Sequence, residues 1–156
     1  IPANRLGFIE ATTDNGVKAL NKNQIVVLFP EGEYGNFKPS SKAYQLQEFK
    51  RGFIRMAIMT GAPIVPTLIL GAEETHVNLS RLKLTKFLRG VVLPLPLNII
   101  PLPSKWKIIF MEPIYLPYKH EAADDRELMR EIANDLQERM QDRLNKELKK
   151  RGSVFI

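Results

Sequence analysis

The sequence predicts an α/β fold, and three of its patterns support this prediction. Apolar, β-branched runs at 24–29, 62–70 and 106–111 are typical of strands, and the first two enclose a stretch with helical spacing. The order strand, helix, strand favours a mixed, mostly parallel sheet flanked by helices. A long amphipathic pattern near the C-terminal end adds a final helix.

The first predicted strand ends at a candidate binding loop. Residues 24–29 form an apolar run that suits a strand buried on both faces, and Pro30 ends it. The loop after it is expected to leave the carboxyl edge of the sheet, where ligands usually bind in such folds. Glu31 places a carboxylate there, and Gly32 allows a substrate to approach the backbone closely. The alternative is a structural turn with an exposed acid.

The residues that follow predict a helix and then a second strand. Apolar residues recur at helical spacing from about 45 to 60, and Gly61 ends the pattern. In the run at 62–70, Pro63 and Pro66 predict an irregular or edge-like beginning of the strand.

Residues 79–103 combine basic side chains with an apolar, proline-rich run. The spacing at 79–88 fits an amphipathic helix, whereas the run at 91–103 is too short for a membrane span, which needs about 20 apolar residues. Two hypotheses stay open for this run: a membrane-facing lip, or a buried loop packed under the terminal helix. In the hypothesis of a membrane-facing lip, four neighbouring cations hold the domain at an anionic lipid surface: Arg81, Lys83, Lys86 and Arg89.

The terminal helix is predicted from Asp124 to Lys150. Asp124 and Glu127 fit a capping box, and the polar face carries both signs of charge equally. We therefore expect the helix to dock on the domain or on a second copy rather than to insert in lipid. The predicted organisation is a domain part at 1–118 with this amphipathic segment, 119–156, packed on it. Its apolar stripe consists of Leu128, Ile132, Leu136, Met140, Leu144 and Leu148.

Composition and charge narrow the functional classes. The chain has 156 residues, 44% of them hydrophobic, which suits one folded domain. It has no cysteine and only two histidines, His76 and His120, so we expect no disulfide, no thiolate nucleophile and no metal site. The net charge of +6 lies entirely within 1–118 and suits anionic lipids or phosphorylated substrates. The basic residues are not interleaved with aromatic residues in a binding motif, so nucleic acid is not expected as a partner.

Four short blocks follow one another along the chain: Gly7-Phe8-Ile9-Glu10, Phe29-Pro30-Glu31-Gly32, Phe49-Lys50-Arg51-Gly52 and Ala62-Pro63-Ile64-Val65-Pro66. In this order they resemble the glycerolipid (lysophosphatidic acid type) acyltransferase superfamily. Later blocks at 71–75, 103–106 and 111–114 resemble its monoacylglycerol and diacylglycerol acyltransferase-like branch. The resemblance covers about residues 5 to 117.

The resemblance implies a partial glycerol-3-phosphate acyltransferase-like fold and transfer of a fatty acyl group to a glycerolipid hydroxyl. The donor is acyl-CoA or acyl-carrier protein, and no other cofactor is implied. It also implies a cytoplasmic protein, peripheral on the inner face of a membrane, and leaves the oligomeric state open. The substrate-binding residues that it implies are Phe29, Pro30, Glu31, Gly32, Lys50, Gly52 and Pro66.

The sequence departs from the family pattern in the acceptor block. Tyr34 stands two residues past Gly32, where phosphate-acceptor members commonly have arginine. Either other cations replace that arginine, or the acceptor is a neutral, diglyceride-like lipid. The candidate cations are Lys50, Arg51, Lys42 and Arg5.

A second departure concerns catalysis. The family uses a histidine as general base and an aspartate five residues later to orient it, but no histidine precedes Phe29. His120 and Asp125 have the spacing but follow the last block, and Asp125 fits a helix start better. We therefore expect a fragment without the catalytic segment, or a member that has lost it. The alternative function is a non-enzymatic lipid-binding or scaffold domain on the same fold.

Overall fold

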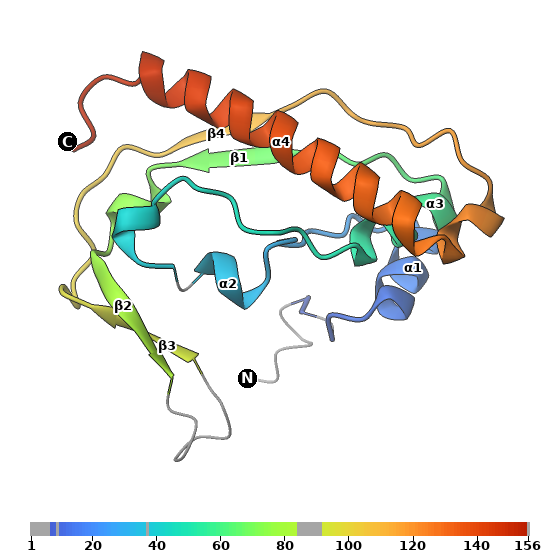
Figure 1. The fold of residues 1–156 in the computed structure, drawn as a ribbon, viewed down its shortest axis with the longest axis horizontal. Helices are drawn as coiled ribbons and strands as arrows, with labels where there is room; N and C mark the ends of the chain where they lie inside the picture. The colour runs from blue at the N-terminus through green and yellow to red at the C-terminus, as the bar shows by residue number, and fades with distance from the viewer. Residues whose placement is uncertain (1–6, 9, 37, 84–91, 156) are drawn as a thin grey trace.

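The computed structural model describes residues 7–8, 10–36, 38–83 and 92–155. These residues form a mixed α/β arrangement that ends in a long helix (Figure 1). The longer helices are α1 (Thr13–Asn21), α3 (Gly52–Thr60) and α4 (Arg126–Lys150), and the short ones are α2 (Glu33–Asn36), η2 (Ser40–Lys42), η3 (Ala72–Glu74) and η4 (His120–Asp124). The strands are β1 (Thr67–Leu70), β2 (Asn78–Lys83), β3 (Val92–Pro96) and β4 (Lys107–Phe110).

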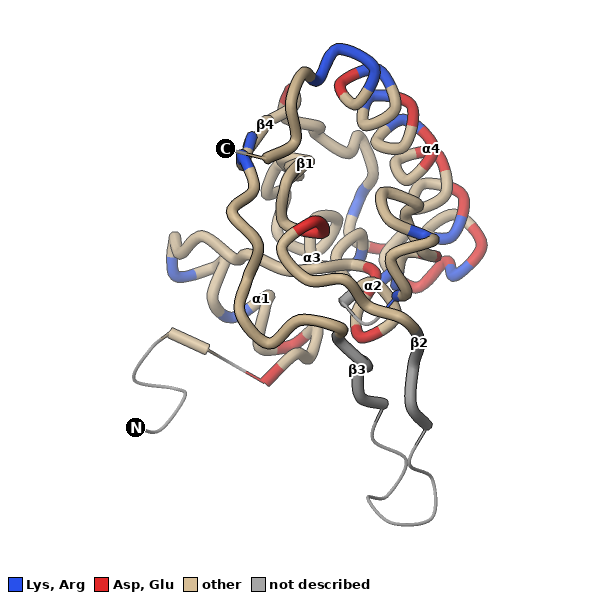
Figure 2. Tube along the Cα trace, turned by 90° about the vertical axis from the view of Figure 1, so that its left-hand side faces the viewer, with Lys and Arg blue, Asp and Glu red and all other residues tan. Residues whose placement is uncertain are grey.

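The terminal helix α4 packs against α3, β1 and η4. Its first-turn amides bind a side chain one residue later than predicted: Asp125 Oδ1 accepts hydrogen bonds from Glu127 N and Leu128 N, each at 3.0 Å. The helix lies along α3 and β1, and Lys, Arg, Asp and Glu residues occur along its whole length (Figures 1 and 2). Its buried residues are Met129, Ala133, Leu136, Met140, Leu144 and Glu147.

The second and third predicted strands form, but they pair with each other in antiparallel orientation. Leu68 of β1 lies opposite Ile109 of β4, and the two ladders among the described residues are both antiparallel. A mostly parallel sheet is therefore not what these residues build. Leu68 and Leu70 are buried toward α4, whereas Ile108 and Phe110 on the other face are more than half exposed.

The first predicted strand, residues 24–29, belongs to no ladder among the described residues, and the expectation of burial was wrong there. Ile25 and Val27 are 93% and 81% exposed. The apolar run gives the segment a strand-like composition, but a strand forms only when a neighbour completes its hydrogen bonds.

The helix predicted from about 45 begins only at Gly52. The amides just before it have partners elsewhere: Leu46 N donates to Gln141 Oε1 at 2.8 Å, and Lys50 N donates to the Pro30 carbonyl at 2.9 Å. Because these donors are already used, the helix does not begin before Gly52.

The helix predicted at 79–88 was also wrong in its described part, because 79–83 belong to β2, which pairs with β3 in an antiparallel hairpin that projects from the body (Figure 1). Prolines are tolerated in β3, since each strand of a two-stranded ribbon has an outer edge without partners. Residues 84–91, and with them Lys86 and Arg89, lie outside the described residues. In the described part of the chain, no helix is long and apolar enough to cross a membrane.

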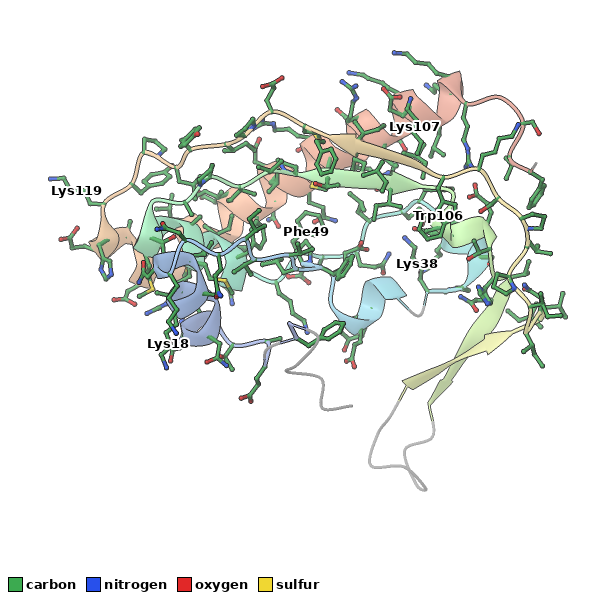
Figure 3. All side chains as sticks on the ribbon, turned by 180° about the vertical axis from the view of Figure 1, so that it is seen from behind. Lys18, Lys38, Phe49, Trp106, Lys107 and Lys119 are labelled. Atoms are coloured by element: carbon green, nitrogen blue, oxygen red, sulfur yellow. The ribbon has the colours of Figure 1, made fainter. Side chains whose placement is uncertain are left out.

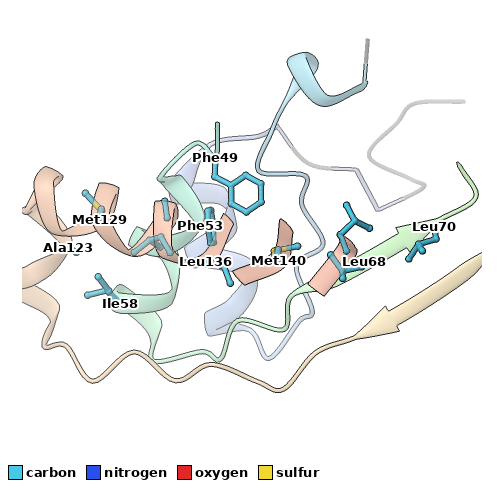
Figure 4. Close-up of a cluster of buried hydrophobic side chains, with 12 residues drawn as sticks. Phe49, Phe53, Ile58, Leu68, Leu70, Ala123, Met129, Leu136 and Met140 are labelled. Atoms are coloured by element: carbon cyan, nitrogen blue, oxygen red, sulfur yellow. The ribbon is translucent and has the colours of Figure 1, made fainter. Parts of the chain in front are cut away.

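One hydrophobic core joins α3, β1, η4 and α4 (Figure 4). Phe49 and Phe53 meet edge to face with ring centroids 6.2 Å apart, and Ile54 is fully buried beside them. Since Phe49 precedes α3 by three residues, the core fixes the segment that carries Lys50 and Arg51.

Candidate functional site

The loop Pro30–Gly32 lies against the segment that precedes α3. Besides the bond from Lys50 N to the Pro30 carbonyl, Gly32 N donates to the Phe29 carbonyl at 3.0 Å and closes a turn. Two family-like blocks that are about 20 residues apart in sequence are thus joined through their backbones.

Gly32 makes room for the Lys50 side chain. Its φ is +59°, a conformation that favours glycine, and a Cβ atom there would lie 2.9 Å from Lys50 Nζ. The ammonium group is therefore held directly over the glycine backbone. This contact gives Gly32 a specific role beside a positive charge.

Glu31 supports the same segment from the other side. Its Oε2 accepts a hydrogen bond from Gln47 N at 2.6 Å, and its side chain packs so close to Gly35 that a Cβ there would lie 2.9 Å from the Glu31 Cδ. A carboxylate has about four acceptor positions, so this bond leaves capacity for a substrate hydroxyl.

A groove of about 490 Å³ opens beside these residues. Its walls combine aromatic, amide and charged side chains, and Arg51 also donates to the Arg126 carbonyl at the start of α4, at 3.4 Å. Two cations at one groove suit a ligand that carries a phosphate or carboxylate group. The lining residues are Tyr34, Gln47, Glu48, Phe49, Lys50 and Arg51.

The other predicted site residues lie around or away from this groove. Phe29 is 67% exposed at the entrance of the loop, and Gly52 begins α3 directly after Arg51. Pro66 is buried next to β4, where its carbonyl accepts from Met111 N at 2.9 Å, so it holds the sheet and does not line the groove as described. Of the candidate phosphate cations, Lys42 lies in η2, and Arg5 falls outside the described residues.

In the part of the chain that the structure describes, no hydrogen bond or ion pair joins His120 to Asp125. Both side chains are exposed, and Asp125 caps α4 with the oxygen described above. His76 contacts its neighbour, with Nδ1 3.2 Å from Thr75 Oγ1. Within the described ranges, no group of histidine, aspartate and glutamate residues is arranged to hold a metal ion.

A second polar cluster, which the sequence analysis missed, holds the loop before the groove. Tyr44 Oη donates to Glu74 Oε2 at 2.5 Å and accepts from Gly71 N at 2.8 Å and Arg151 Nη1 at 3.1 Å. Burial and then the hydrogen bond to Glu74 raise the pKa of Tyr44 to about 12.

The neighbouring acid completes this cluster. Glu73 accepts from Tyr44 N at 2.8 Å and pairs with the buried Lys38 at 2.8 Å; Figure 3 shows Lys38 and Trp106 on the same end of the molecule. The adjacent acids Glu73 and Glu74 are the feature of the sequence that could have pointed to this cluster. Their side chains hold the fold together through Tyr44, Lys38 and Arg151.

The comparisons with known proteins match the part of the chain that builds the groove. A family model described as Acyltransferase matches residues 1–70, and a 1-acyl-sn-glycerol-3-phosphate acyltransferase of Cocos nucifera is 35% identical over 71 residues, which are 46% of this chain and 21% of that protein. These two matches support the acyltransferase superfamily. No solved structure matches the chain.

Longer matches come from mycobacteria. An uncharacterized protein of Mycobacterium leprae is 37% identical over 163 residues, 97% of this chain and 44% of the relative. An uncharacterized protein of Mycobacterium tuberculosis (strain H37Rv) is 36% identical over 165 residues, 99% of this chain and 46% of the relative. The chain thus spans less than half the length of these relatives.

Proposed function

We propose that this chain is part of an acyltransferase that moves a fatty acyl group from a thioester, acyl-CoA or acyl-carrier protein, to the hydroxyl of a glycerolipid. The observation that carries the proposal is the contact of the Pro30–Gly32 loop with Lys50. It lies within the residues that the family model matches and beside a groove with two cations.

In this proposal the groove holds the acceptor lipid. The Glu31 carboxylate accepts a hydrogen bond from a glycerol hydroxyl, and Gly32 lets the glycerol approach the backbone. The hydroxyl oxygen attacks the thioester carbonyl, the oxyanion that results collapses, and the ester forms as the thiol leaves. The hydroxyl proton passes to a general base, which we do not assign to a residue of this chain.

The charges favour an acceptor with an anionic head. Lys50 and Arg51 line the groove at which the arginine of the family block is replaced by Tyr34. Charge-assisted donors bind phosphate without requiring one particular residue, so we propose a lysophosphatidate-like acceptor over a neutral diglyceride. We place the reaction at the inner face of a membrane, where such an acceptor resides.

A non-enzymatic lipid-binding domain is the second candidate. It is favoured by one observation: the described residues that line the groove include two cations that suit an anionic lipid but no histidine that could act as a general base. Such a domain binds lysophosphatidate in the same groove but consumes no thioester.

The test compares Glu31→Gln with Glu33→Gln in the longest product of the gene. Glu33 is an exposed acid two residues away, in the first turn of α2. With acyl-CoA and lysophosphatidate or monoacylglycerol, we expect Glu31→Gln to lower kcat/KM roughly tenfold or more and Glu33→Gln to leave it unchanged. Wild-type rates in Glu31→Gln would remove the assignment, and saturable lipid binding without any turnover by the wild-type protein would favour the second candidate.

A further inference from the structure

Three large apolar side chains are presented to solvent at the base of the β2–β3 hairpin. Leu97, Ile99 and Ile100 are 69%, 92% and 80% exposed. These exposures exclude a buried loop under α4 for this part of the proline-rich run. An exposed group of neighbouring apolar residues usually marks an interaction surface.

The loop that presents them is held by its own hydrogen bonds. Asn98 Oδ1 accepts from Val77 N at 2.8 Å, and Asn98 Nδ2 donates to the Thr75 carbonyl at 2.9 Å and the Ile100 carbonyl at 2.7 Å. Leu102 N also donates to the Thr75 carbonyl, at 2.8 Å. The two isoleucines therefore stand on a fixed turn.

The sequence that leads into and out of this turn is basic. From Thr75 to Met111 the sequence contains no acidic residue and six basic ones, Arg81, Lys83, Lys86, Arg89, Lys105 and Lys107. Among the described residues, Lys105 is exposed and Lys107 is paired with Glu147 at 2.7 Å, and the two acids just before this stretch, Glu73 and Glu74, are paired with Lys38 and Arg151. Apolar residues next to cations, without acids, match the interface of an anionic bilayer, where cations meet the headgroups and apolar side chains reach the acyl chains.

We propose that the surface formed by Leu97, Ile99 and Ile100, with the basic hairpin beside it, docks the domain on an anionic lipid bilayer. This deepens the proposed function, which places the reaction at a membrane, by naming the surface that docks; the docking itself does not require that the domain transfers acyl groups. The contact is peripheral: the two isoleucines enter the headgroup region while the turn held by Asn98 stays at the surface.

Cosedimentation of the full chain with vesicles tests the proposal. We expect binding to vesicles of phosphatidylglycerol and phosphatidylcholine, weak binding to phosphatidylcholine alone, and loss of binding at high salt. Ile99→Ser/Ile100→Ser should lower the partition coefficient at least about tenfold, because two apolar side chains no longer leave water. Arg81→Gln/Lys83→Gln should lower it roughly 30-fold on the anionic vesicles.

The matched control is Ile25→Ser/Val27→Ser, which removes two equally exposed apolar side chains elsewhere on the molecule. It should bind like the wild-type chain, and circular dichroism should show all three variants folded. Equal binding to neutral and anionic vesicles, wild-type binding by Ile99→Ser/Ile100→Ser, or the same loss in the control would each overturn the proposal. So would a wild-type dimer in sedimentation velocity that the Ile99→Ser/Ile100→Ser variant converts to a monomer, since the surface would then belong to a second copy.

Discussion

Gly32 is the residue on which the contact between the Pro30–Gly32 loop and Lys50 depends most directly. We predict that Gly32→Ala costs about 1–2 kcal/mol of folding stability, because an L-residue is strained at φ +59°, and that it also displaces Lys50. Gly61→Ala is the matched control, since its φ is +68° but a Cβ there would meet nothing within 4 Å. Urea denaturation should show a similar loss in both variants, and only Gly32→Ala should weaken lysophosphatidate binding; equal binding by the two would contradict the role of Lys50.

The raised pKa of Tyr44 predicts that the folded chain becomes less stable at alkaline pH. Its pKa is about 12 in the folded chain and about 10 when unfolded, so the fold favours the neutral phenol. This contribution is fully present below about pH 10 and is lost as the pH rises toward about 12. We expect a loss on the order of 1 kcal/mol, since solvent partly screens the group.

Comparison with Tyr44→Phe isolates this effect from the titration of lysines. The stability difference between the wild-type chain and the variant, measured by urea denaturation, should shrink as the pH is raised from about 9 to about 11.5. A constant difference over this interval would show that the phenol does not contribute through its ionisation.

The residues of the candidate site were predictable where they follow one another in sequence. Glu31, Gly32 and Lys50 were predicted from family-like blocks, and the structure brings them together. Gln47 was not predicted, because it binds Glu31 through its backbone amide, which almost any residue type would supply. Pro66 was placed in the site by its block but packs against β4.

At the scale of elements, the long helix was the most predictable, because a repeated pattern over many residues averages out local exceptions. One exception is Glu147, which lies on the buried face seven residues after Met140. Its side chain is 6% exposed and pairs with Lys107 at 2.7 Å and with Arg143 at 3.1 Å. A buried acid of this kind can be predicted from the sequence only when its partner on another element is known.

This pairing predicts an acid-dependent contribution to stability. The hydrogen bond from Lys107 holds the pKa of Glu147 below its usual range, against the opposing effect of burial. The contribution is present above the ordinary carboxyl pKa of about 4.5 and is lost as the pH falls through the lower pKa of the folded state. Glu147→Gln should therefore be less stable than the wild-type chain at neutral pH and should approach it in acid.

The control for this prediction is Glu138→Gln, an exposed acid on the same helix. Thermal unfolding at neutral pH and at about pH 3 should show little change in this control. A loss that is as large in Glu138→Gln as in Glu147→Gln would point to the net charge of the helix rather than to the pair with Lys107.

The elements that were mispredicted share a cause. Residues 45–50 have helical spacing, but three of their amides donate to Pro30, Glu31 and Gln141. Residues 79–83 pair with β3, a strand that follows later in the chain. In each case contacts distant in sequence decide the local structure, whereas periodicity reports only which side chains tend to be buried.

At the scale of the whole molecule, α4 is connected to the groove and its loop by several hydrogen bonds. Besides the bond from Arg51 to the Arg126 carbonyl, Gln137 Nε2 donates to the Leu46 carbonyl at 3.3 Å. Gln141 Oε1 accepts from Leu46 N at 2.8 Å, and Gln141 Nε2 donates to the Tyr44 carbonyl at 2.9 Å. The next residue along, Gln47, carries the amide that binds Glu31. The helix that was predicted to dock as a separate segment therefore helps to hold the loop that borders the candidate site.

We predict that Gln141→Leu loosens this loop. The substitution keeps a side chain of similar size but leaves the amide of Leu46 and the carbonyl of Tyr44 without these partners, at a cost of about 1–3 kcal/mol. Amide hydrogen exchange should become faster at 46–50, because the bond from Gln47 to Glu31 opens more often once its neighbour is released. Asn134→Leu, at an exposed position of the same helix, should leave exchange there unchanged. Protection of 46–50 that is equal in both variants would show that Phe49 and the core, rather than Gln141, fix the loop.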